Sequence, residues 1–225
     1  MIRFSDGLPW ESMIGQVVHG NCLDLLRNMG DGSVDLCLVD PPYGICEPSG
    51  AISKKREKNR YDVYVDSDDN WHSVVYPAIL ECLRVAKRVI VTPGNRHLTD
   101  YPRPDSIGVI YQPASVGMQK WGFADGQVIL YYGRDPRLGE TISPCSFVVT
   151  ESARGIDHPC PKPLHFWEKL LLKGSLEGDL VLDPFMGSWT TARACKNLGR
   201  RFIGCEISEE YCRIGEERLR QEILF

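Results

Sequence analysis

The apolar residues of this chain fall into two patterns, which predict buried strands and amphipathic helices in alternation. Short continuous apolar runs bounded by turn residues are typical of buried strands, whereas apolar residues three and four positions apart are typical of one helix face. The pattern predicts strands at residues 34–39, 107–111, 127–132, 146–150, 180–183 and 202–206, with a further strand that starts at Val89. It predicts helices at residues 71–87, 162–173 and 190–199, and a last helix that Ser208 caps. Strands and helices that alternate in this way indicate an α/β domain.

The run at residues 34–39 ends in Asp40-Pro41-Pro42-Tyr43, whose chemistry suits a flat base that carries an amino group. Proline fixes φ and has no N–H, so this turn is stiff and its carbonyls point outward. Asp40 and the carbonyl of Pro41 can both accept hydrogen bonds from one NH2 group. Tyr43 offers a ring for stacking, an interaction of about 1–3 kcal/mol per base. Asp-Pro-Pro is also ordinary turn chemistry, so the tetrapeptide alone leaves both interpretations open.

A second segment, at residues 180–206, has the layout of a nucleoside-binding βαβ unit. A short apolar strand ends at Asp183, a turn that contains Gly187 follows, and a helix comes next. The following strand ends in Glu206, nineteen positions after Gly187. In dinucleotide-binding folds, an acid about 20 residues beyond the glycine turn accepts hydrogen bonds from ribose hydroxyls. This unit therefore indicates a cofactor with a nucleoside moiety.

Taken together, these segments resemble the amino-directed DNA methyltransferases, which use S-adenosylmethionine. Residues 40–43 match the catalytic tetrapeptide of that family, residues 183–188 its cofactor loop and residues 203–206 its ribose strand. Further segments that match in a consistent order are residues 19–26, 88–94 and 158–164. The tetrapeptide precedes the cofactor loop by 143 positions, which is the permuted motif order of the family's beta class. The resemblance covers nearly the whole chain.

Two other methyltransferase families match less well. Glutamine-modifying protein methyltransferases carry a related Asn-Pro-Pro-Tyr, but they place it after the cofactor loop. Cytosine carbon-5 methyltransferases attack the base with a cysteine that follows proline, and this chain has Pro-Cys at residues 144–145 and 159–160. Those enzymes put the cofactor loop first, and Cys160 lies inside a segment that matches the amino-directed family. Both interpretations are therefore disfavoured.

The resemblance implies a doubly wound, mostly parallel Rossmann-like sheet of the methyltransferase type, within one domain over residues 1–225. It assigns catalysis to Asp40, Pro41, Pro42 and Tyr43. It assigns cofactor binding to Asn21, Cys22, Asp40, His158, Lys162, Asp183, Phe185, Gly187, Ser188, Thr190 and Glu206.

Two positions depart from the family's usual pattern. Asn21 stands where aspartate is more frequent, and its amide can still bond the adenine edge of the cofactor. Trp189 stands where glycine is usual. Its indole would either point outward and form a lid on the pocket, which we favour, or crowd the cofactor or the strand–helix contact.

The activity that the resemblance implies is site-specific methylation of DNA at the N6 amine of adenine. Asp40 and the Pro41 carbonyl would orient the nitrogen and offset its developing positive charge in a direct displacement. The target nucleotide would be flipped out and stacked on Tyr43. Adenine is preferred because cytosine N4 enzymes more often carry serine in place of Asp40. The alternatives are a cytosine N4 or RNA methyltransferase, or a decayed domain that binds cofactor or DNA without methylation.

The composition is compatible with one α/β domain in the cytoplasm. The chain has 225 residues, of which 43% are hydrophobic and 25% charged, as is ordinary for a soluble domain. No basic apolar leader and no stretch of membrane-spanning length is found, so we expect no membrane partner and a location in a prokaryotic cell or a phage-infected host. Nine cysteines and five histidines show no metal-ligand spacing, so no metal is expected. The oligomeric state, monomer or homodimer, stays open.

The net charge of −4 and the pI of 5.8 are unlike those of a protein that coats nucleic acid without specificity. Affinity for DNA must therefore come from a local patch, and one dense basic cluster follows the tetrapeptide. Its members are Lys54, Lys55, Arg56, Lys58 and Arg60. We interpret this cluster as a phosphate contact, with a solvated charge run as the alternative. Residues 47–70 and 101–142 are interpreted as DNA-contacting or target-recognition insertions.

Overall fold

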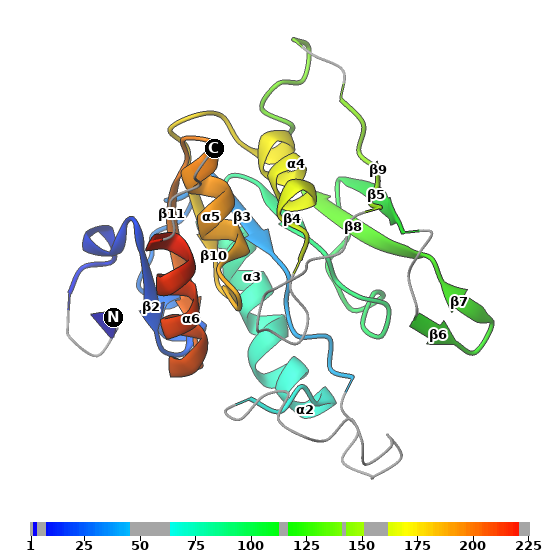
Figure 1. Cartoon of the computed structure of the whole chain (residues 1–225), viewed down its shortest axis with the longest axis horizontal. Helices are drawn as coiled ribbons and strands as arrows, with labels where there is room; N and C mark the ends of the chain where they lie inside the picture. Colours follow the sequence, from blue (N-terminus) through cyan, green and yellow to red (C-terminus); the bar gives the residue numbers. More distant parts are fainter. Residues whose placement is uncertain are drawn as a thin grey trace.

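The computed structural model describes residues 2–3, 8–45, 64–112, 117–140, 143–150 and 162–220. Within this part of the chain, the strands form a nine-stranded sheet and a separate two-stranded hairpin (Figure 1). The sheet order is β1-β2-β11-β10-β3-β4-β8-β5-β9. Its strands are β1 (Ile2–Arg3), β2 (Gln16–His19), β3 (Leu36–Val39), β4 (Val89–Val91), β5 (Ser106–Tyr111), β8 (Gly126–Tyr132), β9 (Phe147–Val148), β10 (Leu180–Asp183) and β11 (Arg201–Glu206). The hairpin consists of β6 (Gly117–Gln119) and β7 (Gly122–Ala124).

The sheet is parallel from β1 to β4 and mixed beyond that strand. β2 pairs with β1 and β11, β10 pairs with β11 and β3, and β3 pairs with β4, all in parallel. β8 runs antiparallel to both β4 and β5, and β9 is parallel to β5. The predicted mostly parallel, doubly wound sheet is therefore confirmed.

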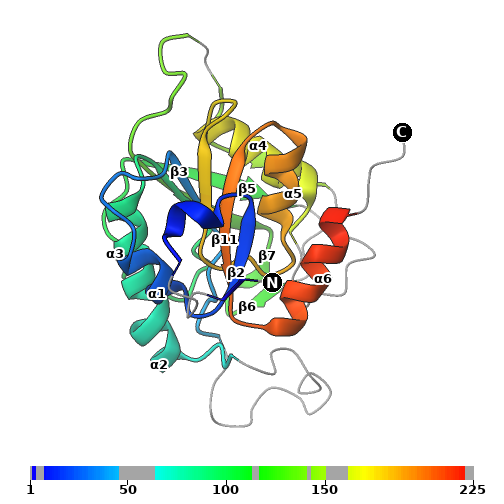
Figure 2. The same cartoon turned by 90° about the vertical axis from the view of Figure 1, so that its left-hand side faces the viewer.

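Helices cover both faces of the sheet, as Figure 2 shows. α1 (Cys22–Arg27) and α3 (Tyr76–Val85) pack on one face, where Leu25 and Ile79 belong to the same buried cluster. α4 (Leu164–Gly174), α5 (Thr190–Asn197) and α6 (Glu209–Arg220) pack on the other face, with Trp167, Ala194 and Cys212 in a second cluster. A short helix, α2 (Asp68–Asn70), and a π-helical turn, Trp71–Val75, precede α3, and a 3-10 turn, Trp10–Met13, precedes β2. Among the described residues, no helix has the length and apolarity that crossing a membrane requires.

Strand β3 shows why the central strands read as continuous apolar runs. Its four side chains have no exposed surface. Leu36 and Leu38 belong to the cluster under α4 and α5, whereas Cys37 and Val39 belong to the cluster under α1 and α3. A parallel strand with helices on both faces must be apolar at every position. Asp40 directly follows this strand and therefore lies where the carboxyl ends of the parallel strands meet.

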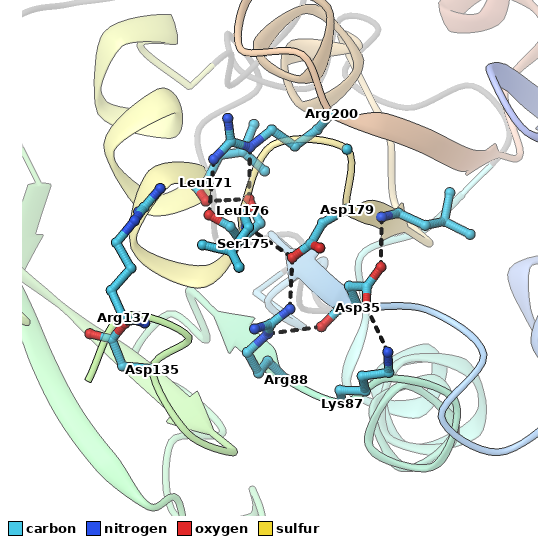
Figure 3. Close-up of polar contacts among 12 residues, drawn as sticks. Asp35, Lys87, Arg88, Asp135, Arg137, Leu171, Ser175, Leu176, Asp179 and Arg200 are labelled. Atoms are coloured by element: carbon cyan, nitrogen blue, oxygen red, sulfur yellow. Dashed lines mark hydrogen bonds and ion pairs between the residues drawn. The ribbon is translucent and has the colours of Figure 1, made fainter. Parts of the chain in front are cut away.

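A polar network joins the amino ends of β3, β4 and β10 (Figure 3). The carboxylate of Asp35 accepts hydrogen bonds from Lys87 Nζ and from the backbone N–H of Leu180, both at 2.9 Å. Arg88 donates to the carboxylate of Asp179 at 2.8 Å and to the carbonyl of Asp35 at 3.0 Å. Burial raises the pKa of Asp35, but the bonds from Lys87 and Leu180 outweigh it and hold the pKa below its ordinary value. This network fixes the register of three central strands at the edge opposite their carboxyl ends.

Several local details differ from the sequence-based expectation. Residues 71–75 form a π turn instead of the first part of an α-helix, because Pro77 has no N–H to continue the regular ladder. The helix expected at Lys162 begins at Leu164, after Pro163 as its N-cap. The pattern did not predict β1, β2 or the hairpin β6–β7. β1, β6 and β7 have only two or three residues, too few to show a period, and β2 has only two buried positions between polar ends. The strands predicted at residues 107–111 and 127–132 are confirmed, as β5 and β8 of the main sheet, although both lie inside the stretch 101–142 that was interpreted as an insertion.

Candidate active site

A cavity of about 290 Å³ lies at the carboxyl ends of four neighbouring strands. Gly20, Asp40, Asp183 and Glu206 line it from the ends of β2, β3, β10 and β11. Open α/β sheets bind their ligands at this edge. Every described member of the two predicted sets lines the cavity: Asn21, Cys22, Asp40, Pro41, Pro42, Tyr43, Lys162, Asp183, Phe185, Gly187, Ser188, Thr190 and Glu206. Two motifs that lie far apart in the sequence therefore share one cavity.

Six of the predicted site residues lie outside the described part of the chain. They are His158, which was expected to bind the cofactor, and the basic cluster of Lys54, Lys55, Arg56, Lys58 and Arg60. Their roles stay predictions.

Asp40 is held in place by three side chains from different elements. Its Oδ1 accepts hydrogen bonds from the hydroxyl of Thr92 at 2.6 Å and from the hydroxyl of Tyr43 at 2.7 Å. Its Oδ2 forms an ion pair with Lys162 Nζ at 3.0 Å. The Asp40 side chain is 23% exposed, so one oxygen is fixed by hydroxyls while the other faces a cation at the cavity wall.

Tyr43 is fixed at both its hydroxyl and its ring. The hydroxyl donates to Asp40 and accepts from Gln127 Nε2 at 2.8 Å and from Lys162 Nζ at 3.0 Å. A Cβ on Gly94 would lie 2.8 Å from the ring, and Gly94 has φ of +67°, so only glycine fits there. Burial and the nearby Asp40 charge raise the pKa of Tyr43, so the phenol stays neutral and its ring orientation is set before any ligand enters.

Asp183 ends β10 in a buried pocket of neutral donors. It accepts hydrogen bonds from the backbone N–H of Phe185 at 3.0 Å and from the hydroxyl of Thr191. Trp167 Nε1 donates to the same Thr191 hydroxyl at 2.6 Å. Burial raises the pKa of Asp183 to about 7, against the lowering effect of the bonds from Thr191 and Phe185. This carboxyl group therefore titrates near neutral pH.

Glu206 ends β11 and holds the glycine turn. Its Oε2 accepts from the backbone N–H of Gly187 at 2.7 Å, and its Oε1 accepts from the backbone N–H of Ser208 at 2.8 Å. Burial raises the pKa of Glu206, while the bonds from Ser208 and Gly187 oppose that rise. The turn and the acid predicted to contact the cofactor are thus joined directly.

Asn21 is the N-cap of α1 and Cys22 is its first residue, and both line the cavity. Asn21 Oδ1 caps the helix by accepting from the backbone N–H of Leu23 at 3.0 Å. Burial raises the pKa of the Cys22 thiol to about 12, so Cys22 is a neutral packing residue at neutral pH.

Comparisons with known proteins agree with this geometry. A family model described as DNA methylase, for N6 and N4 methyltransferases, matches residues 109–217. The type II methyltransferase M.HpaI of Haemophilus parainfluenzae is 25% identical over 244 residues, which cover 92% of this chain and 74% of the relative. The DNA adenine methyltransferase YhdJ of Escherichia coli (strain K12) is 28% identical over 254 residues, which cover 90% of this chain and 82% of that protein. By its motifs, by the family model and by these relatives, the chain is similar to the amino-directed DNA methyltransferases.

A solved structure shows the fold that these methyltransferases share. The crystal structure of M1.HpyAVI in complex with SAM matches this methyltransferase with a TM-score of 0.67 and 21% identity. The match covers 92% of this chain and 99% of the other. The sheet and its helices are therefore common to both proteins.

Trp189 does not form the lid on the methyltransferase pocket that the sequence suggested. Only 4% of the residue is exposed, and it is absent from the residues that line the cavity. Its indole packs against α6, where a Cβ on Gly215 would lie 2.1 Å from the ring. Trp189 has φ of +60°, so it adopts the left-handed backbone that favours glycine. The lid hypothesis is wrong, and the indole does not crowd the cavity either.

Several residues at this site had no role in the interpretation of the sequence. Thr92 and Gln127 support Asp40 and Tyr43 from β4 and β8, and Asp66 accepts from the backbone N–H of Gly44 at 2.6 Å. Thr92 follows a predicted strand, so its position at a strand end was a usable signal. No local sequence pattern marks Gln127 or Asp66, because only the tertiary fold brings them close to the tetrapeptide.

Proposed function

We propose that this protein is a site-specific DNA methyltransferase that moves the methyl group of S-adenosylmethionine to the N6 amine of a flipped-out adenine. The observation that carries this proposal is the single cavity shared by Asp40, Pro41 and Tyr43 on one side and Asp183, Gly187 and Glu206 on the other. The turn that we propose for the base and the turn that we propose for the nucleoside both line this cavity. DNA is the proposed partner, and the cytoplasm of a bacterial cell or of a phage-infected host is the proposed location.

The cavity residues fit S-adenosylmethionine, which when bound supplies a methyl group on a positively charged sulfur. Glu206 lies beside the Gly187 turn and would accept from the ribose hydroxyls, sharing or exchanging its present bonds to backbone N–H groups. Asp183 would face the cationic amino acid part of the cofactor. The amide of Asn21 would contact the adenine edge. Ser188 and Thr190 line the cavity beside Gly187 and would hold the cofactor between these ends.

Asp40 and the Pro41 carbonyl would accept the two N–H bonds of the target amine. This orients the nitrogen lone pair towards the methyl carbon and offsets the positive charge that the nitrogen gains. Lys162 Nζ lies 3.0 Å from Asp40 Oδ2 and 5.4 Å from the centre of the Tyr43 ring. The Lys162 ammonium group therefore occupies the position proposed for the target base and its amine. It would move aside when the base enters. A base inside a duplex cannot reach this position, so the nucleotide is flipped out.

Two features support adenine over cytosine. The tetrapeptide begins with Asp40, as in the adenine enzymes that the chain resembles, and the relative YhdJ is named as a DNA adenine methyltransferase. The chemistry of the same cavity also allows two alternatives, methylation of cytosine at N4 and methylation of RNA.

The proposal is tested by nucleoside analysis of DNA and RNA from cells that express the wild-type protein or the Asp40→Ala variant. We expect N6-methyladenine in DNA with the wild type and a loss of at least about 100-fold with the variant, because an oriented acceptor at the reacting nitrogen is worth about 3 kcal/mol or more. The variant should still bind S-adenosylmethionine in calorimetry. N4-methylcytosine or methylated RNA in place of N6-methyladenine would reassign the substrate, and no methylated nucleoside would reject the activity.

A further inference from the structure

One tryptophan of this methyltransferase is completely exposed. Trp121 has a relative exposure of 100%, whereas the next most exposed large apolar residues among the described positions reach 62%. Trp71, Trp167 and Trp189 have exposures of at most 4%. A free indole in water loses the favourable burial that large aromatic rings normally obtain, so its position calls for a partner outside the fold.

Trp121 occupies the tip of the hairpin β6–β7. The register pairs Gln119 with Gly122, so Lys120 and Trp121 form the two-residue loop between the strands. Figure 1 shows the hairpin projecting beyond β5 and β8. Lys120 is exposed as well, so the tip presents a flat apolar ring beside a cation.

The hairpin continues directly into the strand that supports the catalytic tyrosine. β7 ends at Ala124, β8 begins at Gly126, and the next residue, Gln127, donates to the Tyr43 hydroxyl at 2.8 Å. The backbone N–H of Gln112 bonds to the carbonyl of Asp125 at 2.7 Å and ties the hairpin base to the end of β5. Six residues of extended chain span at most about 20 Å, so Trp121 lies within about 20 Å of Gln127, a distance that about six stacked base pairs would span.

We propose that Trp121 is a wedge that enters the duplex beside the target nucleotide and stacks in the space that the flipped base leaves. This inference rests on the proposed function of the cavity. A base that leaves the stack exposes the faces of its neighbours, and aromatic or apolar side chains that insert at such a step offset the lost stacking. Lys120 contacts the adjacent phosphate. Trp121 is thus a positioning residue, since it acts on the equilibrium of flipping and touches neither the methyl group nor the amine.

The test compares single-turnover methyl transfer on two DNA duplexes at saturating S-adenosylmethionine. Both duplexes carry the site found by mapping methylated adenines in cells that express the wild type. In one duplex the target adenine is paired, and in the other it faces an abasic position, so that flipping costs less. The variants are Trp121→Ala and Trp121→Phe, with Leu138→Ala as the matched control. Leu138 is 59% exposed and follows the opposite end of β8.

Trp121→Ala should slow transfer on the paired duplex by about tenfold, which corresponds to about 1.4 kcal/mol, and by less than about threefold on the abasic duplex. Trp121→Phe should keep most of the rate on both, and Leu138→Ala should match the wild type. Equal slowing of Trp121→Ala on both duplexes, or slowing on neither, would overturn the wedge while leaving the proposed function intact. A wild type that methylates neither duplex would overturn both.

Discussion

Two carboxylates at neighbouring strand ends have opposite surroundings. Asp40 faces the ammonium group of Lys162 at 3.0 Å, whereas Asp183 is 3% exposed and meets only neutral donors. If the cationic cofactor binds beside Asp183, it would bring a positive charge next to this carboxyl group. We therefore propose that the target amine replaces Lys162 at Asp40, and that the cationic cofactor favours the ionised form of Asp183.

This difference predicts that cofactor affinity depends on pH through Asp183. Its raised pKa of about 7 means that ionisation increases as the pH rises through 7, so the affinity for cationic S-adenosylmethionine should increase in that direction. We expect the dissociation constant to be roughly eightfold higher at pH 6 than at pH 7.5. Calorimetry at the two pH values measures it. Asp183→Asn should bind more weakly and without this dependence, and an unchanged pH dependence in the variant would remove Asp183 from the cofactor site.

The same shift has a consequence for the protein without cofactor. Because the folded state holds the Asp183 proton more tightly than the unfolded chain, folding binds a proton between about pH 4 and pH 7. The contribution of Asp183 to stability is thus fully present below about pH 4 and is lost as the pH rises towards 7. Added S-adenosylmethionine should offset this loss at neutral pH.

At the scale of elements, the cofactor turn and α6 are fitted to each other. Trp189 is the N-cap of α5 in a left-handed conformation, and Gly215 stands in the middle of α6. Left-handed backbone costs a residue with a side chain about 1–2 kcal/mol, and glycine costs a helix about 1 kcal/mol. One contact explains both the left-handed Trp189 and the glycine in α6, because the indole occupies the space that a side chain at position 215 would fill. Arg218 of α6 also donates to the carbonyl of Ser188, so α6 holds the turn at two points.

This contact predicts a reversal of sign in a double-mutant cycle. Gly215→Ala should destabilise the wild type, because its Cβ would lie 2.1 Å from the indole. In the Trp189→Gly background the same change should stabilise the protein by about 0.5–1 kcal/mol, since alanine is the better helix former. Trp189→Gly alone should destabilise by about 2 kcal/mol, as lost burial of about 3–5 kcal/mol exceeds the relief of strain. Urea unfolding measures each step, and additive effects would contradict the contact.

At the scale of the whole molecule, the net charge of −4 repels DNA unless positive charge is concentrated near the site. The predicted basic cluster follows the tetrapeptide in sequence, and the described structure ends at Ile45 and resumes at Tyr64. Both flanks return to the cavity, because Ile45 and Tyr64 each line it. The described residues on either side of the cluster therefore both lie at the cavity.

Neutralising the five basic residues of this cluster should weaken DNA binding and flatten its dependence on salt. Each lost phosphate contact removes about one unit from the slope of log affinity against log salt. The affinity for S-adenosylmethionine should not change. Fluorescence titration of labelled DNA at several salt concentrations gives the slope, and an unaltered slope would assign the cluster to solvent.

The sequence by itself determined most of the central strands, the helices that follow them and the chemistry at the strand ends. Continuous apolar runs indicated strands buried on both faces, and the residues after them, Asp40, Asp183 and Glu206, were found at the cavity as predicted. The carboxyl ends of parallel strands meet at one edge of a sheet, so motifs at those ends come together whatever the loop lengths. The turns that we propose for the cofactor and for the base could thus be located from local patterns.

Only the tertiary structure decided which distant side chains support these residues and where Trp189 points. Gln127 lies 84 positions from Tyr43 and Lys162 lies 119 positions from it, and both reach its hydroxyl because of the strand order and the path of the chain before α4. Trp189 could turn towards solvent, the cofactor or α6 as far as local sequence was concerned. The small volume of Gly215, 26 positions later, selected α6. Contacts of this kind depend on which surfaces the fold packs together, and local sequence patterns do not predict that packing.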